Sequence, residues 1–396
     1  MKKKLFALFM ACILVFGLTA CKSSTSSTSG ENSTEATPTT SGASATDAAE
    51  GETTDTATTE VYPEEKVLIG VELYDPTESE TLAIQSYFDY LSQNFNVEFK
   101  YSEAIADADG EMKFIEDCAM AGCKAFFGYY NVTGTEQISK VLEYGMYYYG
   151  RVDDASFDTY KKDPLYLGYV VAGGDEYEKG EALGKWVKEQ GYTNVVYANG
   201  GADFGVQQFV QRQAGFMDAV GTEVDVTVVS GFPNDQFFAD QAAALSKEGL
   251  QAVVASFNGL DFWAQPIASA GLNDVKLATI GAVNDPYVEG FASGAVDYLV
   301  SSNLNGYGLG VAIMLNAVDG NADAIENSGI AIDYHVPTWF IGNADDCKKL
   351  NDILNGEKVY SADDLKSLIV KLNPDANYQK VVDLADAGAL EKVLSK

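Results

Sequence analysis

The fold is decided by the stretch at residues 66–101, which reads KVLIGVELYDPTESETLAIQSYFDYLSQNFNVEFKY. The almost wholly apolar run Val67–Leu73 is typical of a strand that is covered on both faces of a parallel sheet. Apolar residues then recur at helical spacing over Ser79–Phe95, and a second strand pattern follows at Val97–Tyr101. Strand, helix and strand in this order predict a parallel βαβ unit.

The same alternation of short apolar runs and longer amphipathic segments continues along the chain. Further strands are predicted at Lys124–Tyr129, Met146–Tyr149, Leu167–Val171, Asn194–Ala198, Val224–Val229, Ala252–Ser256 and Leu277–Ile280. Helices are predicted between them at Gly110–Ala121, Glu136–Glu143, Glu178–Gln190, Val206–Ala219, Gln236–Leu245 and Trp263–Ala270. Two successive sets of such units predict an α/β fold. We expect two similar, doubly wound parallel-sheet lobes, joined by a multi-strand hinge, with a ligand cleft between them.

The order of these units along the chain predicts where each lobe begins and ends. We expect lobe I to comprise residues 63–172 and 303–337, and lobe II to comprise residues 173–302 and 338–345. Residues 346–396 are expected to form a helical appendix that packs against a lobe. Its predicted helices are Asp346–Leu354, Ala362–Leu372 and Tyr378–Leu394.

The N-terminus carries the pattern of an export signal. Three lysines at residues 2–4 precede an apolar run, and that run ends in Leu-Thr-Ala-Cys at residues 18–21. This ending resembles the lipobox of bacterial lipoproteins, which implies cleavage after residue 20, a diacylglycerol on Cys21 and a place on the outer face of the cell membrane. A plain secretory signal is the alternative. Residues 21–62, rich in Ser, Thr and Ala, are predicted to be a disordered tether.

Composition and motif content exclude several classes of function. A formal net charge of −32 argues against nucleic acid as a partner, because phosphates would be repelled. No HExxH, CxxC or phosphate-binding glycine loop occurs, and His335 is the only histidine. We therefore expect no metal, no cofactor and no enzymatic triad, although hydrolysis by carboxylates alone stays open. Cys118 and Cys123 are expected to be buried thiols, with a disulfide as the alternative.

Several short landmarks occur in a fixed order along the two predicted lobes. They are Gly70-Val71, Asp75-Pro76, Asp175-Glu176 with Gly180, Arg212 with Gly215-Phe216, Phe257-Asn258-Gly259, and Gly281 with Asn284-Asp285-Pro286. In this order the chain resembles the type I periplasmic binding proteins of the ribose and galactose class. The resemblance covers residues 66–336 and implies a sugar ligand held between the lobes. It also implies delivery of that ligand to the transmembrane subunits of an ABC permease.

Two arginines stand out as candidate ligand-binding residues independently of the resemblance. Arg151 and Arg212 are the only arginines in a chain that otherwise uses lysine. Arg151 comes just after a predicted strand of lobe I, and Arg212 lies near the start of a predicted helix of lobe II, so both side chains can face the predicted cleft. The planar guanidinium group donates paired hydrogen bonds to vicinal hydroxyls or a carboxylate, which suits a polar ligand.

Other candidate residues are polar or aromatic. The resemblance implies hydrogen bonding to the ligand by Asp75, Asp175, Asn258 and Asn284. Aromatic faces stack on the C–H side of a sugar, and Tyr74, Phe237 and Trp263 are the candidates for this role. The aromatic pair that the family carries after its Asn-Pro turn is Thr77-Glu78 in this chain.

The sequence therefore predicts a monomeric, extracytoplasmic, lipid-anchored solute-binding protein that captures a monosaccharide or short sugar for an ABC importer. The alternatives are a nucleoside-binding lipoprotein, a protein that presents its ligand to a sensor, and an exported carbohydrate-processing enzyme that works through paired carboxylates.

Overall fold

The computed structural model describes residues 62–73, 75–150, 152–172 and 175–396. The expected signal segment, Cys21, Tyr74 and Arg151 lie outside the described residues. So does all of the expected tether except Tyr62.

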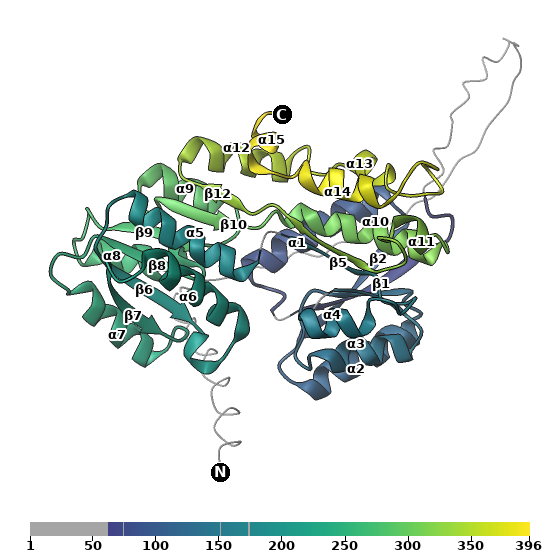
Figure 1. The fold of residues 1–396 in the computed structure, drawn as a ribbon, viewed down its shortest axis with the longest axis horizontal. Coiled ribbons are helices and arrows are strands. Elements are labelled where there is room, and N and C mark those ends of the chain that lie inside the picture. The colour runs from purple at the N-terminus through teal and green to yellow at the C-terminus, as the bar shows by residue number, and fades with distance from the viewer. Residues whose placement is uncertain (1–61, 74, 151, 173–174) are drawn as a thin grey trace, which may run out of the picture. The chain divides into compact units, whose positions relative to one another are not determined.

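Lobe I is built on a four-stranded parallel sheet in the order β2-β1-β3-β4. Figure 1 labels β1 and β2 of this sheet. Its strands are β1 (Val67–Leu73), β2 (Val97–Ala104), β3 (Ala125–Gly128) and β4 (Tyr147–Gly150). Its first helices are α1 (Ser79–Asn94), α2 (Ala108–Ala121), α3 (Thr135–Glu143) and α4 (Asp154–Tyr160). The apolar run quoted above is the central strand β1, in which Ile69 and Val71 are completely buried. The predicted βαβ unit at residues 66–101 is confirmed.

Lobe I is completed by segments from later in the sequence. Strands β5 (Gly168–Ala172) and β11 (Ile332–Val336) pair in parallel as a separate two-stranded sheet. Helices α10 (Tyr307–Val318) and α11 (Ala322–Ile325) follow a short 3-10 turn, η4 (Leu304–Gly306). Helix α10 is buried along nearly its whole length, as expected for a helix that is apolar on every side.

Lobe II contains a six-stranded sheet in the order β12-β10-β9-β8-β6-β7, in which only β12 runs antiparallel to its neighbour. The strands are β6 (Asn194–Gly200), β7 (Asp225–Ser230), β8 (Ala252–Ala255), β9 (Lys276–Ile280), β10 (Tyr298–Ser301) and β12 (Trp339–Ile341). Parallel sheets in both lobes confirm the predicted α/β class.

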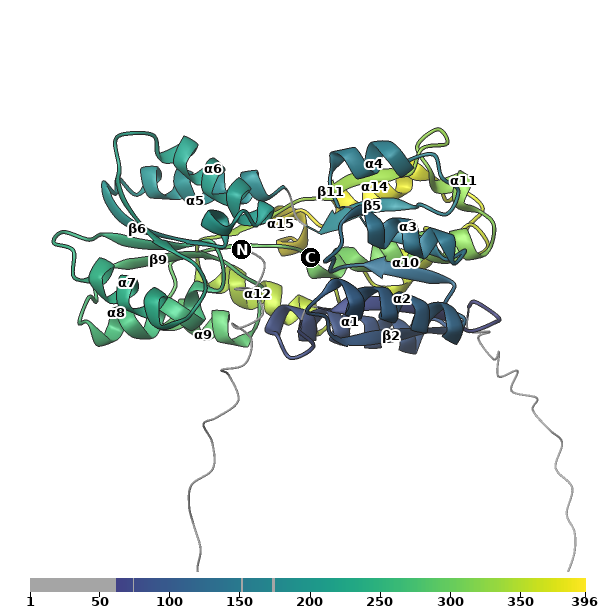
Figure 2. The same ribbon diagram turned by 90° about the horizontal axis from the view of Figure 1, so that it is seen from below.

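Helices cover both faces of the lobe II sheet. The helical elements of this lobe are α5 (Glu176–Glu189), η2 (Ala202–Phe204), α6 (Gln207–Val220), α7 (Asp235–Leu245), the π-helical turn η3 (Leu260–Ala264), α8 (Gln265–Ser269) and α9 (Asp285–Ser293). Figure 2 shows α5 and α6 on one face, with α7, α8 and α9 on the other. No helix in the described part of the chain is both long and apolar enough to span a membrane.

The C-terminal appendix contains α12 (Ala344–Asn355), α13 (Ala362–Lys366), α14 (Tyr378–Asp386) and α15 (Leu390–Leu394). Two of its predicted helices were wrong in extent. The helix predicted from residue 362 ends at Lys366, and the single helix predicted over residues 378–394 is interrupted at residues 387–389. The interruption turns the Gly388 carbonyl toward the Trp339 indole, whose Nε1 donates to it at 2.8 Å.

Cys118 and Cys123 are free, buried thiols, as expected. Helix α2 ends between them. Gly122 adopts a left-handed conformation (φ 84°), and the Cys123 N–H donates to the Cys118 carbonyl at 3.0 Å. This turn brings the two thiols together, and a hydrogen bond between them raises the pKa of Cys118 and lowers the pKa of Cys123.

Candidate functional site

Three neighbouring parallel strands of lobe II end at the same edge of the sheet. Strand β6 ends at Gly200, β7 at Ser230 and β8 at Ala255. Ligands of doubly wound sheets bind outside the carboxyl ends of the strands. The segments that follow these three strands are therefore the first place to look for a site.

Helices α5 and α6 pack against each other at this edge with almost no space between their backbones. A Cβ atom on Gly180 would lie 1.9 Å from the Arg212 carbonyl oxygen. A Cβ atom on Gly215 would lie 2.1 Å from the Tyr177 carbonyl oxygen. Only glycine allows this approach, which brings the first turn of α5 within reach of the Arg212 side chain.

Arg212 lies at the centre of a small charged cluster. Its Nε forms an ion pair with the Glu176 carboxylate, and its Nη1 donates to the Ser256 carbonyl oxygen at 2.7 Å. Lys179 binds the other oxygen of the same carboxylate at 2.9 Å. The guanidinium carbon lies 5.1 Å from the centre of the Phe209 ring, a cation–π distance. The cluster therefore fixes the planar fork of the guanidinium in one orientation.

The charges in this cluster determine the protonation of Glu176. Burial alone would raise the pKa of this carboxyl group, but Arg212 and Lys179 together lower it to about 2. Glu176 is therefore ionised at neutral pH. Its single negative charge is shared between the two cations of the cluster.

An acidic side chain of lobe I lies near the cluster. Burial and the charge of Glu78 raise the pKa of Glu80 in the first turn of α1, whereas the charges of Lys179 and Arg212 lower it. These influences place a lobe I carboxylate close to the lobe II cations. Burial and the same Glu78 also raise the pKa of Asp261 in η3. The first turn of α1 thus faces the strand-end edge of lobe II.

Lobe I adds a group of tyrosines around Glu80. The rings of Tyr129, which follows β3, and Tyr307, which opens α10, meet edge to face at 5.7 Å. Burial raises the pKa of Tyr129, of Tyr307 and of Tyr169 in β5, and the charge of Glu80 adds to each rise. All three hydroxyl groups therefore stay protonated near neutral pH. Tyr307 is hydrogen-bonded to Tyr169, and Tyr129 to Thr81, so the three hydroxyls belong to a local polar network.

Phenylalanines line the corresponding edge of lobe II. The rings of Phe209, Phe232 and Phe257 meet pairwise at 5.5 to 5.7 Å in edge-to-face contacts. Phe232 is 43% exposed and the neighbouring Phe204 is 69% exposed. The buried Phe209 ring contacts both the Arg212 guanidinium and the other two rings, so this edge combines apolar faces with a directional hydrogen-bond donor, as small-molecule sites do.

Three of the predicted polar residues serve local structure. The Asp75 carboxylate accepts from the Thr77 N–H at 2.8 Å and from its hydroxyl at 2.7 Å, which closes a turn before α1. Asp175 caps α5 by accepting from the Glu178 N–H at 2.6 Å. Asn284 caps α9 in the same way.

The other predicted residues divide between the edge and the core. Arg212 lies in the cluster described above. Asn258 lies in the turn after β8, three residues beyond its end, is half-buried and has a left-handed backbone (φ 31°). Phe237 is 1% exposed and packs edge to face against Trp263, itself completely buried. The structure thus brings Arg212 and Asn258 to the same edge and places Phe237 in the core.

Sequence reasoning missed several residues of this site. It singled out Asp175, but the adjacent Glu176 makes the ion pair with Arg212. The spacing of Glu176 and Lys179, three residues apart on one helix, was the available signal for a paired carboxylate. No pattern in the sequence pointed to Glu80, to Asp261 or to the tyrosines. In the described residues, no group of three or more His, Cys, Asp or Glu side chains is arranged to hold a metal ion.

Comparisons with known proteins find likeness in structure but not in sequence. No family model matches the chain, and no curated protein matches it. A periplasmic solute-binding protein of an ABC transporter from Actinobacillus succinogenes, solved with bound D-allose, is 14% identical with a TM-score of 0.58. The match covers 72% of this chain and 99% of that chain.

Two further solved solute-binding proteins are similar to this chain in structure. An ABC-transporter solute-binding protein from Bacillus halodurans with bound myo-inositol is 18% identical, with a TM-score of 0.56 over 72% of this chain and 97% of that chain. A galactofuranose-binding protein is 17% identical, with a TM-score of 0.53 over 75% of this chain and 99% of that chain. The chain therefore has the two-lobed α/β fold of the type I periplasmic binding proteins.

Proposed function

We propose that this chain is a solute-binding protein that holds a monosaccharide or short sugar between its two lobes and delivers it to an ABC import permease. The observation that carries the proposal is the Arg212 cluster at the strand-end edge of lobe II. Its guanidinium is oriented by Glu176 and Ser256, and it lies against the Phe209 ring, which packs on Phe232 and Phe257. The solved structures of the same fold that hold D-allose and myo-inositol support a polyhydroxylated ligand.

The chemistry of the site suits such a ligand. Vicinal hydroxyl groups accept paired hydrogen bonds from a guanidinium and donate to carboxylates such as Glu80 and Asp261. The Phe257 ring offers an apolar face for the C–H side of the sugar, and the Tyr129 hydroxyl offers a further polar contact. Both lobes contribute to the proposed contacts, so the ligand would bridge the two lobes.

A thermal-shift screen of monosaccharides and cyclitols, starting with D-allose and myo-inositol, tests this proposal. A ligand at about 100 times its dissociation constant stabilises a protein by about 2.7 kcal/mol, which raises the melting temperature visibly. We expect at least one sugar to do so for the wild-type chain and to lose the effect with Arg212→Ala. The matched control is Lys247→Ala, which removes a cation paired with Asp225 at 2.9 Å at the start of β7. If no sugar in the panel raises the melting temperature of the wild-type protein, the proposal is rejected.

We further infer that Cys21 carries a lipid and holds the protein at the outer face of the membrane. The Leu-Thr-Ala-Cys stretch at residues 18–21 and the polar segment that follows it support this inference. Metabolic labelling with a palmitate analogue should mark the wild-type protein and leave Cys21→Ser unmarked. Labelling of both proteins would contradict the assignment of the lipid to this cysteine.

A further inference from the structure

The C-terminal appendix, which begins with α12 at residue 344, lies along one side of the protein and buries its apolar face against it. Its apolar side chains join the same hydrophobic cluster as residues of both lobes. Those with no exposed surface include Cys347, Leu350, Tyr360, Leu365 and Val381. The sequence predicted packing against one lobe, whereas the appendix contacts two.

At one end the appendix contacts lobe II. Helix α12 lies against α9, as Figure 1 shows. The Asn351 amide in α12 donates to the Asp285 carboxylate in α9 at 2.6 Å. Cys347 and Leu350, one turn apart on α12, are completely buried in this contact region.

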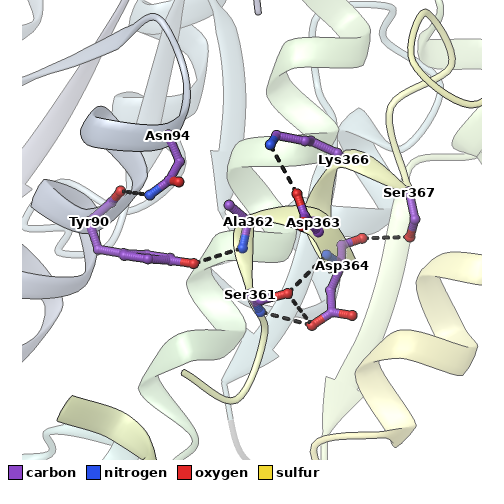
Figure 3. Close-up of polar contacts among 8 residues, drawn as sticks. All are labelled: Tyr90, Asn94, Ser361, Ala362, Asp363, Asp364, Lys366 and Ser367. Atoms are coloured by element: carbon purple, nitrogen blue, oxygen red, sulfur yellow. Dashed lines mark hydrogen bonds and ion pairs between the residues drawn. The ribbon is translucent and has the colours of Figure 1, made fainter. Parts of the chain in front are cut away.

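At the other end the appendix contacts lobe I. The Tyr90 hydroxyl in α1 accepts from the Ala362 N–H at 2.9 Å (Figure 3). The Asn316 side chain in α10 bonds two backbone groups that follow α13: it donates to the Leu368 carbonyl and accepts from the Val370 N–H, both at 2.8 Å. Helix α14 also contacts α11 and β11.

A capping box fixes the point at which the appendix enters lobe I. The Ser361 hydroxyl accepts from the Asp364 N–H at 3.1 Å, and the Asp364 carboxylate accepts from the Ser361 N–H at 2.9 Å (Figure 3). Such reciprocal bonds hold the start of a helix in one conformation. The segment directly before α13, which contains Tyr360, is therefore firmly held at its lobe I end.

The appendix adds chain connections between the lobes. The chain already passes between them from β5 to α5, from β10 to α10, and from β11 to β12. It passes back to lobe I between α12 and α13. It then returns toward lobe II between α14 and α15, because α15 packs on α12. The appendix thus runs in parallel with the three strand connections of the hinge.

Hydrogen bonds join these connections to one another. The Tyr360 hydroxyl donates to the Ala385 carbonyl at 2.9 Å and accepts from the Asn303 amide at 3.3 Å. The Gly388 carbonyl accepts from the Trp339 indole at 2.8 Å. A Cβ atom on Gly388 would lie 2.0 Å from the Tyr360 hydroxyl oxygen, so the segments are in direct contact. Tyr360 is thus bonded both to a strand connection and to the later part of the appendix.

We propose that Tyr360 and the appendix brace the hinge and hold the two lobes at one separation. A hinge that moves must change backbone angles in every connection between the lobes. Here two of those connections belong to a buried helical layer that packs on both lobes, so a large change of angle would separate core side chains from one another. Tyr360 is accordingly a positioning residue for the candidate site, although it lies outside that site.

The distance between the lobes can be measured by pulsed electron paramagnetic resonance. Nitroxides would be attached at Glu136→Cys in α3 and Ala242→Cys in α7, both exposed positions, in a protein that carries Cys12→Ser and Cys21→Ser. Cys118, Cys123 and Cys347, the cysteines of the described residues, are buried. We expect the wild-type protein without ligand to give one narrow distance distribution. Tyr360→Phe, which removes only the hydroxyl bonds to Asn303 and Ala385, should widen that distribution about twofold.

The matched control is Tyr90→Phe, which removes a single hydroxyl bond to the appendix on the lobe I side and should leave the width unchanged. Gly388→Ala provides a second disruption, since its methyl group must displace the Tyr360 hydroxyl. A broad or two-peaked distribution in the wild-type protein would overturn the brace even if no variant folds. So would a narrow distribution in a folded Tyr360→Phe or Gly388→Ala protein. These readouts need no ligand, so they stand apart from the test of sugar binding.

Discussion

Glu72 and Glu111 lie together in the interior of lobe I, each with 0% of its surface exposed. The Gln137 amide joins them by donating to Glu72 at 3.1 Å and to Glu111 at 2.8 Å. Glu111 also accepts from the Val132 and Thr133 N–H groups at 2.7 and 2.9 Å. Two carboxyl groups therefore anchor the loop after β3, which begins with Tyr129 of the candidate site.

This pair makes stability depend on pH. Burial, followed by the charge of Glu111, raises the pKa of Glu72 to about 9 from its ordinary 4.5. The folded protein then holds a proton that the unfolded chain releases. Its stabilising effect is complete below pH 4.5 and is lost as the pH rises toward 9, at up to about 1.4 kcal/mol per pH unit. Glu72→Gln should therefore gain stability relative to the wild type as the pH rises.

Urea unfolding of both proteins at pH 5, 7 and 9 measures this difference. Glu98→Gln, which removes an exposed carboxylate from β2, controls for the change in net charge. A difference between Glu72→Gln and the wild type that stays constant from pH 5 to 9 would show that Glu72 is not a proton-binding group of the folded state.

The Glu176 ion pair should give stability the opposite dependence on pH, with its contribution lost at acid pH. The pKa of this carboxyl group is about 2, below its ordinary 4.5, because Arg212 and Lys179 outweigh the effect of burial. Its contribution is present above pH 4.5 and is lost as the pH falls toward 2. Glu176→Gln should reduce stability by about 1–3 kcal/mol at pH 7, and the deficit should shrink by pH 3. Thermal unfolding at both pH values measures this, and an equal deficit at both would contradict the ion-pair account.

The close approach of α5 and α6 makes Gly180 sensitive to substitution. A methyl group at this position would meet the Arg212 backbone, so Gly180→Ala should cost about 1–3 kcal/mol through overpacking. Gly110→Ala in α2 is the matched control, because its nearest neighbour would lie at 3.3 Å and helix propensity favours alanine. Chemical denaturation compares the two variants. If they prove equally stable, the tight contact does not exist in solution.

Local patterns predicted most of the fold. The buried strands β1 and β8 appear as continuous apolar runs, and the helices between strands follow amphipathic spacing. The appendix was harder to predict, because its shape depends on distant contacts. Residues 378–394 have an unbroken helical pattern, yet the chain bends at Gly388 to meet Trp339 and Tyr360. No local signal encodes such a contact.

The candidate site was predicted only in part for the same reason. Arg212 was found because arginine is rare in this chain and its geometry is specific. Its partner Glu176 was missed and the adjacent Asp175 was chosen instead. The structure distinguishes the two: Asp175 caps the start of α5, whereas Glu176 reaches Arg212 on α6. Phe237 shows the opposite error. It was predicted to contact the ligand, but it packs into the core against Trp263.

The central claim is that a sugar is held by side chains of both lobes, and equilibrium titration of paired variants tests it most directly. D-allose, myo-inositol and any further sugar found by thermal shift would be titrated into the wild type, Tyr129→Ala of lobe I, Phe257→Ala of lobe II and the double variant. We expect each single variant to weaken binding at least tenfold, while far-ultraviolet circular dichroism shows that the fold is intact. Unchanged affinity in either folded single variant would contradict the claim that the ligand lies between the lobes.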